Sequence, residues 1–142
     1  MSFGNTTENN FMKLLFNATT WANVAINATS SPITDIAVAL ATSDPGETGT
    51  LSTNEVAYTD YAREDVARTS GGWTVTNNSV SPAAAIDFTV GSGGSGTVTH
   101  GSVGMPGGGA AIMFMTGAVT PNIVTGSGVT PRIGIGSTFV ID

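Results

Sequence analysis

The stretch "ITDIAVALATSDPGE", residues 33–47, decides the fold class. From Ile36 to Ala41 it is apolar at successive positions, which is typical of a central strand that is buried on both faces. Asp44-Pro45-Gly46-Glu47 follows, with proline at the second position and glycine at the third, as in a type II turn. The stretch therefore predicts a buried strand that ends in a tight turn.

Further strand signals follow this one along the chain. Apolar and polar residues alternate from Trp73 to Thr76 and from Ile86 to Val90, and the runs 97–105, 110–120 and 132–142 are also strand-like. Strand candidates at intervals of about 8–15 residues, separated by turn signals, predict an all-β, jelly-roll-like β-sandwich of about eight strands. The predicted core consists of Ile36, Val38, Leu40, Val75, Ile86, Phe88, Val98, Ile112, Phe114, Ile133 and Ile135.

One stretch before the first strand, "TTENNFMKLLFNATTWANVA" at residues 6–25, has a helical pattern. Thr6 or Thr7 is the predicted N-cap, and Glu8 lies in the first turn, where the helix dipole favours an anion. The predicted buried face, spaced as i, i+3, i+4 and i+7, is Phe11, Leu14, Leu15 and Ala18. The sequence thus divides into an N-terminal arm with one short helix, residues 1–32, and a β-sandwich domain, residues 33–142.

The composition excludes several classes of protein. The net charge is −6 and the four basic residues form no cluster, which argues against a nucleic-acid partner. There is no cysteine, no apolar run long enough for a membrane helix and no signal-peptide pattern at the start. Charged residues make up only 10% of the chain, so contact with other proteins desolvates few ions.

Residues suited to catalysis or metal binding are scarce. His100 is the one histidine and lies in a strand-like run, so zinc, copper and a histidine-based catalytic triad are not expected. The glycine-rich runs do not follow the phosphate-loop pattern, in which a lysine and a hydroxyl residue come directly after the last glycine. The acids between Asp44 and Asp65 do not match a calcium-loop pattern, and we expect a solvated rim in which Arg63 and Arg68 pair some carboxylates, with calcium binding left open. No enzyme activity, cofactor or metal is predicted.

Several ordered motifs resemble one family. "VALATSDPGETGTLSTNEVAYTDYAR" at 38–63, "GTVTHGSVG" at 96–104 and "MFMTGAVTPNIVTGSGVTPRIGIGSTFVI" at 113–141 are similar to a pattern in small virion proteins of tailed bacteriophages. The helical "NNFMKLLF" lies where that family has a short amphipathic helix. These proteins are labelled tail-fibre or head-decoration proteins. After "YAR" the family continues into an apolar strand, whereas this chain has Glu64 and Asp65.

The resemblance implies a non-enzymatic structural protein of the virion. We expect it to decorate and cement the capsid by binding between major capsid protein subunits, as a homo-oligomer, dimer or trimer, on the capsid surface after assembly in the host cytoplasm. The alternative is a tail or head fibre that recognises a host receptor such as a carbohydrate. No membrane partner is expected.

The predicted contact residues fall into two groups. Apolar residues of the arm are expected to fold onto a neighbouring copy or onto the shell, and an acidic rim with one arginine is expected to meet basic capsid residues. The full set is Phe3, Phe11, Leu14, Leu15, Phe16, Asp60, Arg63, Glu64 and Asp65.

Overall fold

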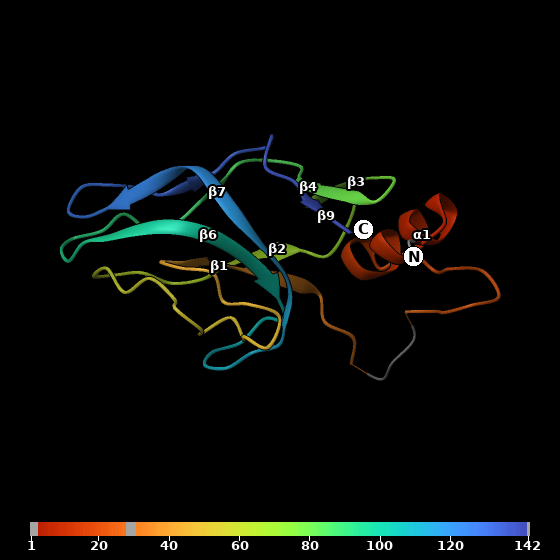
Figure 1. The fold of residues 1–142 in the computed structure, drawn as a ribbon. Coiled ribbons are helices and arrows are strands. Elements are labelled where there is room, and N and C mark those ends of the chain that lie inside the picture. Colours follow the sequence, from red (N-terminus) through yellow and green to blue (C-terminus); the bar gives the residue numbers. More distant parts are fainter. Residues whose placement is uncertain (1–2, 28–30, 142) are drawn as a thin grey trace.

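The computed structural model describes residues 3–27 and 31–141 (Figure 1). The predicted arm is described except at residues 1, 2 and 28–30, and residue 142 also lies outside the described residues. The described residues form one helix and nine strands, in the order α1 (Asn5–Asn17), β1 (Asp35–Ala41), β2 (Glu64–Ala67), β3 (Trp73–Thr76), β4 (Ser79–Pro82), β5 (Ile86–Asp87), β6 (Gly96–Gly104), β7 (Met113–Thr125), β8 (Arg132–Ile133) and β9 (Phe139–Val140).

The strands form antiparallel sheets of four, three and two strands, with the orders β2-β1-β6-β7, β3-β4-β9 and β5-β8. β1 is an inner strand that pairs with β2 and β6, and Ile36 to Ala41 are all buried, which confirms the prediction from the sequence. Gly46 in the following turn has φ +69, as the predicted turn requires. A mostly β chain with several antiparallel sheets and one short helix is therefore confirmed, whereas the all-β class and the jelly-roll ordering stay predictions.

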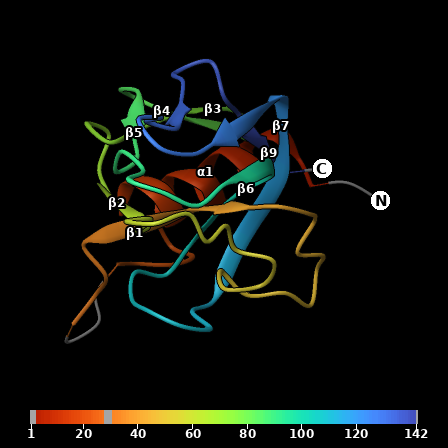
Figure 2. The same ribbon diagram turned by 90° about the vertical axis from the view of Figure 1, so that its left-hand side faces the viewer.

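Helix α1 packs against β3 and β4 at one end of the molecule (Figure 1). Viewed end-on, β3, β4 and β5 lie on one side of the core and β1 and β2 on the other (Figure 2). The helix begins after Gly4 without a side-chain cap, so the predicted cap at Thr6 or Thr7 is wrong. It ends at Asn17, and the next residue, Ala18, adopts the left-handed conformation with φ 52 and caps the helix.

The face of α1 that is buried differs from the predicted one. Glu8, Met12 and Phe16 are the buried residues, and the ring of Phe16 meets Trp73 edge-on at a centroid distance of 5.2 Å. Phe11, which was predicted to lead the buried face, is 45% exposed. The helix turns this other face inward because Trp73 offers it a large apolar surface, and an aromatic pair of this geometry is favourable.

The core prediction is mostly confirmed. The predicted residues that are buried are Ile36, Val38, Leu40, Ile86, Phe88, Val98 and Ile133. Val75 and Phe114 are partly buried and pack against this core. Ile112 and Ile135 are 61% and 63% exposed, so their assignment to the core is wrong. Both lie outside strands, where the alternation of faces no longer holds.

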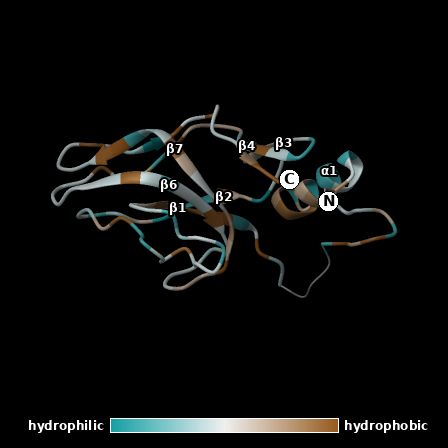
Figure 3. Ribbon diagram, in the orientation of Figure 1, coloured by the Kyte–Doolittle hydropathy of each residue, from teal (hydrophilic) through white to brown (hydrophobic). Residues whose placement is uncertain are grey.

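Much of the ribbon of the four-stranded sheet is white or brown in the hydropathy colouring, so strongly polar residues are few along it (Figure 3). Among the described residues, α1 is too short and too polar to cross a membrane.

Candidate functional site

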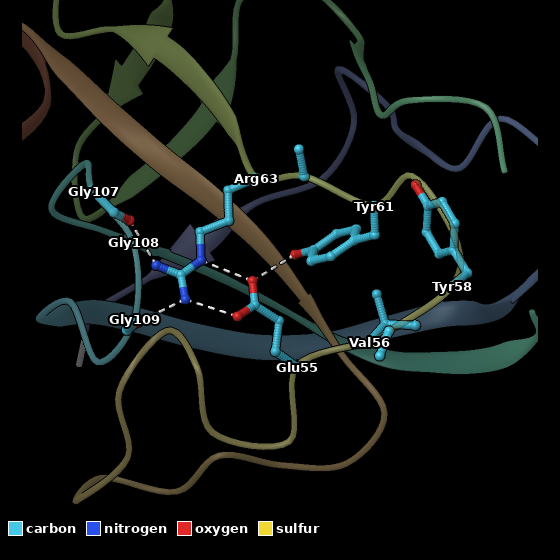
Figure 4. A pocket seen from close by; sticks show the side chains of 10 residues that line it. Glu55, Val56, Tyr58, Tyr61, Arg63, Gly107, Gly108 and Gly109 are labelled. Atoms are coloured by element: carbon cyan, nitrogen blue, oxygen red, sulfur yellow. Dashed lines mark hydrogen bonds and ion pairs between the residues drawn. The ribbon is translucent and has the colours of Figure 1, made fainter.

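The stretch between the Asp44 turn and β2 forms one wall of a hollow of about 600 Å³ (Figure 4). At its centre Arg63 meets Glu55 through two parallel bonds, Nε to Oε1 and Nη2 to Oε2, both 2.7 Å long. The side chains are only 11% and 19% exposed, respectively. A two-point pair of this kind fixes the orientation of both groups as well as bringing their charges together.

The same guanidinium reaches across to a distant loop. Arg63 Nη1 donates to the carbonyl oxygen of Gly107 and Nη2 donates to that of Gly109, each at 2.8 Å. Both glycines have positive φ, 124 and 65, which side-chain-bearing residues rarely adopt. Arg63 therefore ties the glycine loop between β6 and β7 to the segment before β2.

Tyr61 completes this arrangement. Its hydroxyl donates to Glu55 Oε1 at 2.9 Å and accepts the N–H of Leu40 in β1 at 3.0 Å. Burial, more than any other cause, raises the pKa of Tyr61, so its hydroxyl keeps its proton at neutral pH. The polar side chains of the hollow thus bond one another and the backbone, and the arrangement acts as a structural lock.

The structure corrects the predicted role of Arg63 and part of that of Arg68. Arg63 pairs with a carboxylate, as expected, but this occupies it inside the chain, so it is not a free contact residue. Within the described part of the chain, Arg68 pairs with no carboxylate. It is 8% exposed, and it donates to the carbonyl oxygens of Leu14 and Leu15 at 2.6 Å each and to Asn27 Oδ1 at 2.6 Å.

The predicted apolar contact residues are divided by the fold. Phe16 is fully buried against Trp73 and Leu15 is partly buried against the core, so neither forms a free surface. Leu14 is partly exposed, and its carbonyl oxygen accepts a bond from Arg68. Phe3 and Phe11 stay exposed, and with Trp21 and Ile141 they line an apolar hollow of about 370 Å³, which is called the α1 hollow below.

The predicted acidic rim does not gather into one cluster. Asp60 is exposed, has φ 75 and accepts a hydrogen bond from the hydroxyl of Ser92. Glu64 and Asp65 lie on β2 at the edge of the four-stranded sheet. Burial, and then the charge of Asp65, raises the pKa of Glu64. No group of three or more potential metal ligands occurs within residues 3–27 and 31–141.

His100 lies in β6, as predicted from its strand-like surroundings. Its Nδ1 is 2.9 Å from the hydroxyl oxygen of Thr99, and its neighbours across the sheet are Ala41 and Ala118. None of these neighbours is a carboxylate that would orient the ring as a general base.

Reasoning from sequence missed two features of the surface. It did not place Glu55 with Arg63, although both lie within the quoted motif at 38–63, and it did not place Asp44 and Glu47 beside β7, with which they line a groove. The sequence does show that residues 113–120 of β7 are strand-like. A strand pattern, however, does not indicate which strand lies at the edge of a sheet.

A family model described as podophage GP4 fiber I protein gp80 matches residues 2–138, nearly the whole chain. A search of the curated proteins found no match.

Proposed function

This chain belongs to the podophage GP4 fiber I protein gp80 family, and from that premise we propose that it is a non-enzymatic structural subunit of a phage fibre. The family match over residues 2–138 is the observation that carries the proposal. Members of this family are structural proteins of the phage fibre or virion. The proposal adds that this chain acts there through contact with other proteins.

The chemistry of the hollow around Glu55 and Arg63 supports a structural role. Glu55, Tyr61 and Arg63 use their polar atoms on one another, on Leu40 and on the glycine loop. A catalytic acid or base has to reach a substrate proton at hydrogen-bond distance, and these groups are already engaged. A fibre subunit with this structural role could also recognise a host receptor, such as a carbohydrate.

A second candidate function is decoration of the capsid shell between major capsid protein subunits. It is favoured by the compact form of the described residues, in which the helix and the sheets share one core and no separate stem is present. A jelly-roll-like order of the strands, an arrangement found in viral capsid domains, is proposed for the same reason.

Copy number separates the two functions. In purified virions, a fibre subunit is expected at a small fraction of the major capsid protein band on a stained gel, whereas a decorating protein approaches that band in molar terms. Gold-labelled antibody in electron microscopy should then mark fibres rather than the whole shell. Virions that lack the protein altogether would contradict both functions.

We also propose that the protein associates with itself, as a dimer or trimer, through the α1 hollow. Phe3 is 60% exposed and Phe11 is 45% exposed there, and the hollow presents apolar surface only. Burying large aromatic side chains is a main source of affinity in protein contacts.

The Phe11→Ser variant is therefore expected to dissociate at least about tenfold more readily than the unchanged protein, because losing one central aromatic contact costs on the order of 2 kcal/mol. Analytical ultracentrifugation over a range of concentrations measures this. Val90→Ser is the matched control, since Val90 is 50% exposed but does not line the hollow. Equal association of the two variants would place the contact elsewhere.

A further inference from the structure

The two edges of the four-stranded sheet are very different. β2 has only four residues, and two of them, Glu64 and Asp65, are charged. β7 has 13 residues and no charged side chain. Short length and charge are the usual means by which an edge strand is kept from pairing with another chain. β2 has both of these protections and β7 has neither.

Only the first half of β7 offers a regular edge. Met115 to Ala118 pair in unbroken register with Val103 to His100, whereas the register shifts on both sides of this run, between Met113 and Met115 and again before Ile123. Pro121, which has no N–H to donate, lies in the shifted part. From Met113 to Ala118, the backbone pairs with β6 alone among the described elements. This segment has the length of a typical strand and leaves one side of its backbone unpaired.

A groove of about 420 Å³ adjoins the beginning of β7. Met113 to Thr116 and Ile141 line one part of it, and Asp44, Gly46 and Glu47 of the turn after β1 line the other. Asp44 and Glu47 are exposed, and Asp44 Oδ1 accepts the N–H of Gly46 at 2.9 Å, which holds the turn in place. An occupant would therefore meet unpaired backbone, four large apolar side chains and two carboxylates.

We propose that an extended, lysine- or arginine-bearing segment of another virion protein adds to the sheet at Met113–Ala118, with its basic side chains beside Asp44 and Glu47. Addition of a strand to an open edge is a common mode of peptide recognition, in which the backbone supplies affinity and alternate side chains supply specificity. This inference rests on the proposed structural role only in naming a virion protein as the partner.

The charges of the chain argue against a second copy as the occupant. Arg63 is paired with Glu55, Arg132 with Asp87, and Arg68 is buried on backbone carbonyls. The remaining basic residue, Lys13, lies in a helix and not in an extended segment. With a net charge of −6, copies also repel one another at an acidic groove.

The test uses a fluorescein-labelled synthetic peptide, Ac-TKVKVT-amide, titrated with the purified full-length protein and followed by fluorescence anisotropy. The Asp44→Asn/Glu47→Gln variant should bind it about three- to tenfold more weakly, since two surface ion pairs are lost. Asparagine keeps the oxygen that accepts the N–H of Gly46, so the turn is retained. The control, Glu64→Gln/Asp65→Asn, removes the same number of charges at the protected edge and should bind as the unchanged protein does.

Hydrogen exchange tests whether the peptide forms backbone hydrogen bonds with β7. Bound peptide should slow exchange of amides within Met113–Ala118 and leave Glu64–Ala67 unaffected. Equal weakening in both variants, protection at β2, or no binding of the lysine peptide would overturn the proposal. Protection of Met113–Ala118 that rises with protein concentration in the absence of peptide would also overturn it, because a second copy would then be the occupant. If the protein is absent from virions, its proposed function is wrong, but the peptide titration still tests strand addition.

Discussion

Replacing Phe16 with alanine is expected to lower the free energy of unfolding by about 3–5 kcal/mol, the usual cost of truncating a fully buried phenylalanine. Phe16 is 0% exposed and packs edge-on against Trp73, which is itself fully buried. The pair is a main contact between α1 and the β3–β4 sheet, so truncation leaves a cavity that the helix cannot fill by a small shift. Urea denaturation followed by tryptophan fluorescence measures the change.

Phe11→Ala is the matched control on the same helix. Phe11 is 45% exposed, so its truncation should cost less than about 1 kcal/mol. The two variants distinguish the observed face of α1 from the face that the sequence pattern predicted. If Phe11→Ala costs more than Phe16→Ala, the helix is packed the other way round.

The helix shows why a pattern can be read correctly and still give the wrong face. Between Phe11 and Phe16 the sequence "FMKLLF" has only one polar residue, so two faces are nearly equally apolar. Helical periodicity cannot choose between them. The tertiary contact between Phe16 and Trp73, which lies 57 positions further along the chain, determines which face is buried.

The strands were more predictable where both faces are buried. The run from Ile36 to Ala41 has one interpretation, because a continuous apolar stretch bounded by a Pro-Gly turn suits an inner strand, and β1 is one. Ile112 and Ile135 were assigned wrongly because both fall just outside strands: β7 begins at Met113, after Ile112. β8 ends at Ile133, and Ile135 falls in a turn.

The candidate site was predictable in its residues but not in their partners. Glu55, Tyr61 and Arg63 all lie in the stretch that carries the family resemblance. The partners of Arg63 in the glycine loop are 44 and 46 residues away, and no local pattern indicates that approach. An arginine between carboxylates was read as part of an acidic rim, whereas the fold uses it as an internal tie.

Arg68→Met is the second substitution expected to have a large effect, a loss of about 3–4 kcal/mol, because hydrogen bonds to a charged group are strong and their buried partners are left unsatisfied. Arg68 donates to the carbonyl oxygens of Leu14 and Leu15, in the last turn of α1. These carbonyls have no partner within the helix, and the helix dipole places negative charge there. Urea denaturation again provides the measurement.

Two further variants separate the bonding of Arg68 from its charge and its bulk. Arg68→Lys keeps the positive charge but cannot reach several acceptors at once, so its loss should be intermediate. Arg132→Met removes an arginine from the exposed pair with Asp87 and should change stability little, since both of these side chains are open to solvent. Burial lowers the pKa of Arg68, yet an arginine stays protonated at neutral pH, so its effect on stability should not vary across that range. If Arg68→Met and Arg132→Met cost the same, Arg68 does not hold the end of α1 on the sheet, and the helix must be retained by its buried face, which includes Met12 and Phe16.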